Sequence, residues 1–171
     1  MAVASTGYLP SGILEAFRVG NMAESSIQSN GSFLQNAHQL RVLVVEDSPV
    51  QQRAVINLLK QLGHAVSAAN EGFEAISLVQ RNDPYDVILM DCQMPLMDGF
   101  KAARFIKDME RPTSPQSVII GTSDSATADE CFRAGMDDFV SKPLSKANLE
   151  AILKRWLNEM SDRNIIRDNA Q

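Results

Sequence analysis

The sequence lacks several features that would point to particular classes of protein. Its two cysteines, Cys92 and Cys131, lie far apart and form no CxxC pair, which favours a reduced compartment over a disulfide framework. No apolar run approaches the roughly 18 residues of a membrane-spanning helix. The N-terminus lacks the basic and apolar segments of a secretory signal. The net charge of −5 argues against nucleic acid as the main partner, because a nucleic-acid footprint is basic.

What is present is the composition of a soluble globular protein. The 171 residues are 44% hydrophobic and 22% charged, which suits one domain with modest extensions. We therefore expect a cytoplasmic protein. We expect Cys92 to be a small buried residue, with a reactive thiol as the alternative.

Three regions of the chain differ in pattern. Residues 1–40 include a stretch rich in Ser, Asn and Gln, and they are expected to form a flexible N-terminal extension. Ile13–Val19 can form one or two amphipathic turns, and whether these dock on the domain is left open. Residues 41–160 carry a regular pattern and are the predicted domain. Residues 161–171 are expected to be a C-terminal tail.

The regular region alternates apolar runs with amphipathic segments, which predicts an α/β fold with a parallel sheet and helices on both faces. The expected strands are 41–46, 65–69, 86–91, 118–122 and 138–141. The first helix starts with Ser48 as N-cap and Pro49 in its first turn, and stops at Gly63. The later helices are expected at 71–82, from 99 to before Pro112, at 126–134 and at 145–159. The side chains expected to face inward are Val50, Ala54, Leu58 and Leu62, then Phe73, Ile76 and Val79, and last Leu149, Ile152, Leu153 and Trp156.

Polar residues stand where four of these strands end. Glu46 and Asp47 follow the first strand and Asp91 ends the third, whereas Thr122 and Lys142 close the last two. Because ligands bind outside the carboxyl ends of parallel strands, these groups should converge on one edge of the sheet. Adjacent carboxylates are best tolerated around a cation, and Mg²⁺ prefers hard oxygen ligands. The pattern therefore predicts a site for a divalent cation and a phosphoryl group, with Asp91 as a nucleophile that can form an aspartyl phosphate.

Each of these residues also has a simpler interpretation. Glu46 and Asp47 can be a solvated pair in which Asp47 helps to cap a helix, Asp91 can be a turn former, and a lysine at a sheet edge is usually solvated. Their occurrence together, in order, at successive strand ends favours the site.

The motifs around these residues resemble those of response-regulator receiver domains of two-component signalling. The resemblance covers residues 41–160, and its wording is closest to receivers attached to hybrid histidine kinases. It rests on Val-Val-Glu46-Asp47, Met90-Asp91-Cys-Gln-Met-Pro95-Leu-Met-Asp98-Gly99, Thr122-Ser123 and Ala-Gly135-Met-Asp-Asp-Phe139-Val-Ser-Lys142-Pro143. The fold that it implies is flavodoxin-like, a doubly wound five-stranded sheet of order 2-1-3-4-5 with five helices.

The resemblance also implies roles for individual residues. Asp91 accepts a phosphoryl group from a phosphohistidine, and Thr122 and Lys142 bind its oxygens. Mg²⁺, with Mn²⁺ as the alternative, is held by Glu46, Asp47, Asp91 and the backbone carbonyl of Gln93. Phe139 is the aromatic switch residue, which turns inward when Thr122 moves toward the phosphate. The Lys142–Pro143 peptide is cis, and Gln93 and Asp124 tune hydrolysis of the aspartyl phosphate. The output is a conformational switch in the fourth helix, fifth strand and fifth helix.

Two departures from the family pattern bear on the output side. The segment from Thr122 to Lys142 is slightly shorter than the family leads us to expect, which should shorten the fourth helix. Gly121 replaces the more usual apolar residue and is expected to loosen the end of its strand.

The expected partners are a histidine kinase or histidine phosphotransfer protein and a downstream protein target, with neither nucleic acid nor membrane. A phosphorylation-dependent dimer is left open, as is the choice between a stand-alone regulator and part of a hybrid kinase. The chain is expected to be a phosphoacceptor and not an enzyme, apart from self-phosphorylation and autophosphatase activity. A phosphatase with an Asp nucleophile is disfavoured because Gln93 stands where a second acid is needed. The remaining alternative is a phosphate-independent interaction module on the same fold.

Overall fold

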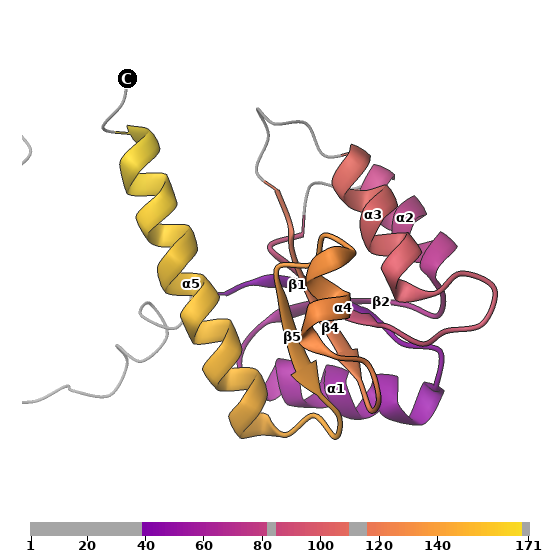
Figure 1. Ribbon diagram of the computed structural model, residues 1–171. Coiled ribbons are helices and arrows are strands. Elements are labelled where there is room, and N and C mark those ends of the chain that lie inside the picture. The colour runs from indigo at the N-terminus through magenta and orange to yellow at the C-terminus, as the bar shows by residue number, and fades with distance from the viewer. Residues whose placement is uncertain (1–38, 82–84, 110–115, 169–171) are drawn as a thin grey trace, which may run out of the picture. The chain divides into compact units, whose positions relative to one another are not determined.

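A computed structural model describes residues 39–81, 85–109 and 116–168, and the expectations for residues 1–38 lie outside these ranges. Five parallel strands form one sheet in the order β2-β1-β3-β4-β5, as the sequence predicts (Figure 1). The strands are β1 (Arg41–Val45), β2 (Ala65–Ala69), β3 (Val87–Asp91), β4 (Val118–Ser123) and β5 (Asp138–Ser141). The helices are α1 (Pro49–Gln61), α2 (Gly72–Arg81), α3 (Gly99–Met109), α4 (Ala128–Arg133) and α5 (Lys146–Asp168).

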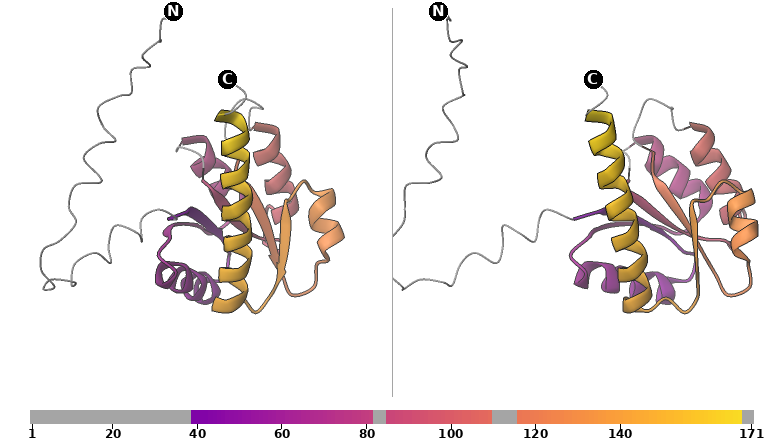
Figure 2. Two further views of the ribbon diagram at one scale, coloured as in Figure 1. Left: turned by 90° about the vertical axis from the view of Figure 1, so that its left-hand side faces the viewer. Right: turned by 60° about the vertical axis from the view of Figure 1, so that its left-hand side comes forward.

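Alternate residues of each strand point to opposite faces of the sheet, and helices cover both faces. The central strands β1, β3 and β4 are therefore buried, whereas the edge strands β2 and β5 are partly exposed. One face packs against α2, α3 and α4 through residues such as Val45, Met90 and Ile119. The other packs against α1 and α5 through the intervening residues, such as Val44 and Leu89. Figure 2 shows α5 running along its face of the sheet.

Helix α1 begins and ends as the sequence predicts. Ser48 is its N-cap and accepts a hydrogen bond from the backbone N–H of Gln51, and Pro49 occupies the first turn. Gly63, with φ of +89°, follows the last turn in the left-handed conformation that glycine adopts without strain.

The faces predicted for α1 and α2 were partly wrong. Val55 and Leu59 are the buried residues of α1, whereas Val50 is 78% exposed and Ala54 is also exposed. The buried face of α1 is thus displaced by one residue from the expected face. Val55 and Leu59 recur at the same helical spacing as the predicted residues, so periodicity alone does not distinguish the two faces. Phe73, expected to face inward, is half exposed. The four inward residues predicted for α5 are all buried.

Helix α5 extends to Asp168 and is longer than the predicted helix 145–159. Neither proline nor glycine occurs after residue 146, so no strong local signal ends the helix. Whether residues 161–171 act as a tail outside the domain stays a prediction. Among the described residues, no helix has the length and hydrophobicity needed to cross a membrane.

Candidate functional site

The polar residues predicted from the strand ends come together at one edge of the sheet. Asp91 pairs with Thr122 in the register of β3 and β4, so both lie at the same level of the sheet. Glu46 follows β1, the other neighbour of β3, and Lys142 follows β5. Of these side chains, Glu46, Asp91 and Thr122 are almost fully buried.

Lys142 ties two of the strand ends together. Its Nζ donates to Glu46 Oε2 at 2.7 Å and to Asp91 Oδ2 at 2.8 Å, and its side chain is only 9% exposed. The remaining oxygens receive backbone N–H groups, from Ser48 to Glu46 Oε1 and from Gln93 to Asp91 Oδ1. One ammonium group is thus shared between two buried carboxylates.

The electrostatics of the site reflect this shortage of positive charge. Burial raises the pKa of Glu46, helped by the negative charge of Asp91 and opposed by the hydrogen bond from Lys142. Burial alone lowers the pKa of Lys142, but its hydrogen bonds to Asp91 and Glu46 outweigh that effect and the pKa is raised. Lys142 is therefore held in its charged form. A further cation would stabilise the carboxylate cluster.

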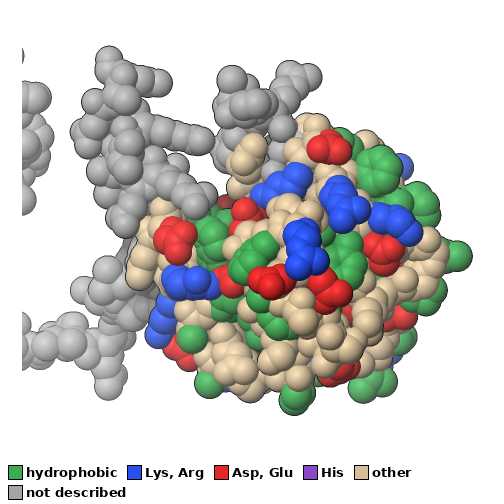
Figure 3. All heavy atoms as spheres, in the orientation of Figure 1, with side chains coloured by type: hydrophobic (Ala, Val, Ile, Leu, Met, Phe, Trp, Pro, Cys, Tyr) green, Lys and Arg blue, Asp and Glu red, His purple; other side chains and the backbone are tan. Residues whose placement is uncertain are grey.

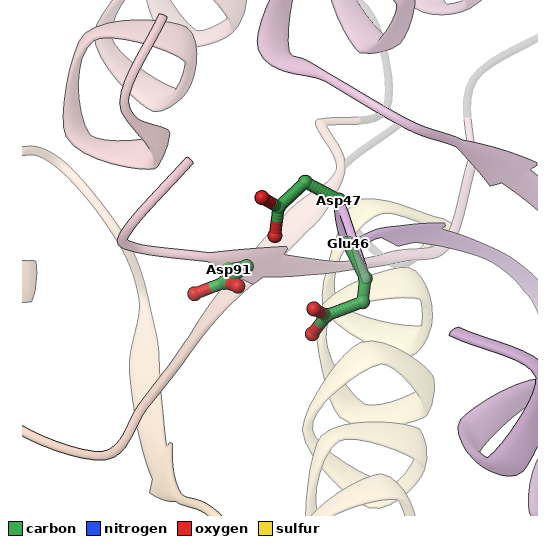
Figure 4. A group of neighbouring side chains, drawn as sticks. All are labelled: Glu46, Asp47 and Asp91. Atoms are coloured by element: carbon green, nitrogen blue, oxygen red, sulfur yellow. The ribbon is translucent and has the colours of Figure 1, made fainter. Parts of the chain in front are cut away.

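Asp47 supplies the third carboxylate. One oxygen from each of Glu46, Asp47 and Asp91 lies within 4.8 Å of the others. Figure 4 shows the three side chains gathered just beyond the ends of β1 and β3. Asp47 is exposed, so the cluster opens to solvent on its side.

Two local features hold the loops that carry these acids. The side-chain amide of Gln52 on α1 donates to the backbone carbonyls of Glu46 and Ala69, which joins α1 to the ends of β1 and β2. Gly99 lies so close to β3 that a Cβ atom there would be 2.1 Å from the carbonyl oxygen of Asp91. The loop after Asp91 can fold back onto the strand only because residue 99 has no side chain. The sequence shows this glycine but gives no sign of the close approach.

The two residues expected to tune hydrolysis lie at the rim of the site. Gln93 is exposed, and its side-chain amide donates to Ser125 Oγ at 2.7 Å across the edge of the sheet. Ser125 was not identified from the sequence, where nothing distinguishes it from other loop serines. Asp124 is exposed and lines a hollow of about 290 Å³ beside Glu46 and Lys142. The rest of that hollow is mainly apolar, formed by Ala54, Val55, Pro143 and Leu144.

The β4–β5 side of the site carries the expected switch residue. Phe139 pairs with Gly121 in the sheet and is partly buried against the cluster under α2, α3 and α4. The Lys142–Pro143 peptide bond is cis. Gly121 does not loosen β4, which continues to Ser123. A Cβ atom at Gly121 would lie 2.7 Å from both Cys131 Sγ and Met136 Sδ, so the missing side chain makes room for these sulfur atoms.

The sequence that forms this fold and this site matches a known protein family. The model of the response regulator receiver domain matches residues 42–154, about two thirds of the chain. The chain belongs to this family. The match contains every residue of the site described above.

The curated relatives of this receiver domain are much longer proteins. Probable histidine kinase 1 of Oryza sativa subsp. indica is 30% identical over 166 residues, covering 78% of this chain and 17% of that protein. Hybrid signal transduction histidine kinase L of Dictyostelium discoideum is 36% identical over 122 residues, covering 68% of this chain and 7% of that protein. The chain therefore spans less than a fifth of either relative.

Solved receiver domains share the fold. The receiver domain of a sensor histidine kinase from Pseudomonas aeruginosa, with a magnesium ion in its active site cleft, matches with a TM-score of 0.63 and 35% identity. The match covers 70% of this chain and 98% of that domain. The receiver domain of Ssk1 from Saccharomyces cerevisiae, crystallised with the histidine phosphotransfer protein Ypd1, matches with a TM-score of 0.63 and 23% identity. That match covers 69% of this chain and 88% of the other.

Proposed function

We propose that this receiver domain accepts a phosphoryl group on Asp91 from a phosphohistidine on a partner protein. The observation that carries the proposal is the pairing of Lys142 with both Glu46 and Asp91 beside a third carboxylate. Phosphoryl transfer needs positioning and charge stabilisation more than covalent chemistry by the protein. This site offers a nucleophile, a fixed ammonium group and oxygen ligands for a cation.

The acidic cluster suits Mg²⁺, with Mn²⁺ as the alternative. Mg²⁺ prefers hard oxygen ligands. One carboxylate oxygen from each of Glu46, Asp47 and Asp91 lies within 4.8 Å of the others, and Asp47 is exposed to solvent. These residues and the backbone carbonyl of Gln93 would hold the ion. When bound, it neutralises the negative charge that the carboxylates and the phosphoryl group bring together. The related Pseudomonas domain with magnesium in its cleft supports this assignment.

Three residues of the chain then have separate roles in the transfer. A carboxylate oxygen of Asp91 attacks phosphorus as the bond from phosphorus to the histidine nitrogen breaks, and the partner's histidine leaves with the electron pair. Lys142, which now donates to Asp91, can donate to a phosphoryl oxygen instead. The hydroxyl of Thr122, at the level of Asp91 in the sheet, is placed to bind a second one.

The hollow beside Lys142 combines charged and apolar side chains, a mixture that suits contact with a protein surface that carries the phosphohistidine. Histidine kinases or histidine phosphotransfer proteins in the cytoplasm are the partners that we propose, and the relatives named as histidine kinases support that class. The chain serves either as a stand-alone regulator or as part of a hybrid kinase.

We further propose that phosphorylation is signalled through α4, β5 and α5. Thr122 is drawn toward the phosphoryl group, and Phe139 turns inward in response. Figure 3 shows basic, acidic and apolar side chains interspersed on the face that carries α4 and β5, a mixture that suits a protein target. Pairing of two phosphorylated copies through α4 is the alternative use of this face.

The test is the intact mass of the full chain after incubation with acetyl phosphate and Mg²⁺. We expect one phosphoryl adduct that disappears without Mg²⁺ and in Asp91→Asn. Asp108→Asn, an exposed acid on α3, is the matched control and keeps the adduct.

An adduct that persists in Asp91→Asn contradicts the assignment of the phosphoacceptor. Absence of any adduct leaves two interpretations, which a beryllofluoride titration separates. Binding of beryllofluoride with Mg²⁺ means that the site works but requires its own phosphohistidine protein. Absence of binding favours a phosphate-independent interaction module.

A further inference from the structure

The fold brings the two cysteines together inside the domain. Cys92 follows Asp91 directly, and Cys131 lies in α4, yet their Sγ atoms are only 3.6 Å apart. Both are free thiols, and both residues are buried, with 1% and 0% of their surfaces exposed. The sequence predicts burial for Cys92 but gives no indication of this contact.

Gly121 leaves room for the two sulfur atoms beside β4. A Cβ atom on Gly121 would lie 2.7 Å from Cys131 Sγ and 3.2 Å from Cys92 Sγ, both closer than ordinary van der Waals contact. Since glycine carries no such atom, the two sulfurs can move toward each other over the backbone of β4. The sulfurs need to approach by about 1.6 Å to reach the disulfide bond length of about 2.05 Å. Cys131 lies in α4, a helix of only six residues, and we infer that α4 supplies this shift.

We propose that Cys92 and Cys131 form a reversible disulfide when the protein meets hydrogen peroxide, which ties α4 to the end of β3. One sulfur attacks a peroxide oxygen, the O–O bond breaks, and a sulfenic acid and one water form. The second sulfur then attacks the sulfenic sulfur, the S–O bond breaks, and the oxygen leaves as a second water. The two thiols lose two electrons and two hydrogens in total, and the peroxide is reduced to water. A dithiol reductant reverses the reaction by thiol–disulfide exchange.

Burial controls when this reaction occurs. Because both sulfurs are buried, peroxide reaches them only when α4 opens locally. The disulfide then restrains the residue next to Asp91 and the helix beside Thr122. The effect of the disulfide on signalling rests on the proposed function, because α4 belongs to the segment that we propose to move. The formation of the disulfide is independent of that function.

The experiment counts thiols in the full chain. Folded protein is treated with hydrogen peroxide, the peroxide is removed, and the protein is denatured and alkylated with N-ethylmaleimide for intact-mass measurement. We expect the number of alkylated thiols to fall from two to zero in monomeric protein, and to return to two after dithiothreitol. Cys131→Ser is the control: its Cys92 can form a sulfenic acid, which adds one oxygen to the mass, but it cannot form the intramolecular disulfide, which removes two hydrogens.

Three outcomes would overturn the proposal. They are retention of both thiols at a dose that oxidises free glutathione, disulfide-linked dimers in place of the monomer, and loss of both thiols only together with the folded circular dichroism spectrum. The thiol count does not involve the phosphoacceptor, so Asp91→Asn should give the wild-type result. Failure of phosphorylation and failure of the disulfide are thereby distinguished.

Discussion

At the scale of single residues, the site depends on a few side chains whose neighbours determine what they can do. Gln93 illustrates this because its backbone and side chain serve different purposes. Its N–H donates to Asp91, whereas its amide group reaches Ser125 across the rim. The amide is thus held at the rim of the site, in the loop that follows Asp91.

We expect Gln93→Ala to lengthen the lifetime of the phosphorylated form several-fold. An amide in this position can orient the attacking water, and alanine cannot. The measurement is the decay of the phosphoryl adduct by intact mass after acetyl phosphate is removed. Gln80→Ala on α2, where the side chain contacts Met109, is the control. An unchanged decay rate in Gln93→Ala would show that its amide has no part in hydrolysis.

His64 gives a second prediction, about pH and stability. It lies between α1 and α5, where its Nδ1 accepts a hydrogen bond from the N–H of Leu40. Glu150 and Lys154, the charged residues that line the same hollow, also pair with each other. Burial lowers the pKa of His64 below its usual 6.5. The unfolded chain therefore binds this proton more readily, and the stability from the neutral histidine is lost as pH falls below about 6.5.

The free energy of unfolding should therefore decrease between pH 7.5 and 5.5, and His64→Gln should reduce that decrease. Urea unfolding at several pH values measures it. His38→Gln replaces the other histidine of the chain and separates its contribution to the pH dependence from that of His64. A His64→Gln profile that falls as steeply as the wild type would exclude His64 as the source.

At the scale of elements, local sequence signals locate the helices well and orient them less well. The Ser48–Pro49 start and the Gly63 stop of α1 depend on neighbouring residues only, so both are visible in the sequence. Which face turns inward depends on the sheet. Val50 and Val55 lie on different sides of α1, and only packing against β1 and α5 selects Val55.

Helix α4 is the element whose local signals matter most, because it is so short. Thr127 caps it through a reciprocal pair of hydrogen bonds with Glu130, a capping box. Thr127→Ala should lower the free energy of unfolding by about 1 kcal/mol. Thr127→Ser keeps the hydroxyl and should recover most of the loss. Urea unfolding of both variants checks this, and equal stability of the alanine and serine variants would argue against a role for the cap.

At the scale of the whole molecule, parallel topology made the site predictable. Once five strands alternate with helices, Glu46, Asp91, Thr122 and Lys142 must reach the same edge, and they do. Contacts that depend on packing between distant segments could not be predicted in this way. The contact of Cys92 with Cys131, and that of Gly99 with the backbone of Asp91, result from the way the helices and loops pack against the sheet.

The same topology couples folding to the cation. Three carboxylates from two strand ends approach one another only in the folded chain, so Mg²⁺ should bind the folded state and stabilise it. A ligand at 100 times its dissociation constant contributes about 2.7 kcal/mol. The melting temperature should therefore rise with Mg²⁺ concentration, and the rise should be strongly reduced in Asp47→Asn.

Asp47 is the best site for this test because it is exposed and forms no ion pair with Lys142, so its amide variant leaves the Lys142 pairs intact. Asp108→Asn, which removes the same charge elsewhere, should respond to Mg²⁺ as the wild type does. An equal response of all three proteins would mean that Mg²⁺ acts on surface charge in general. A response confined to proteins that retain Asp47 would place the ion among the carboxylates at the ends of β1 and β3.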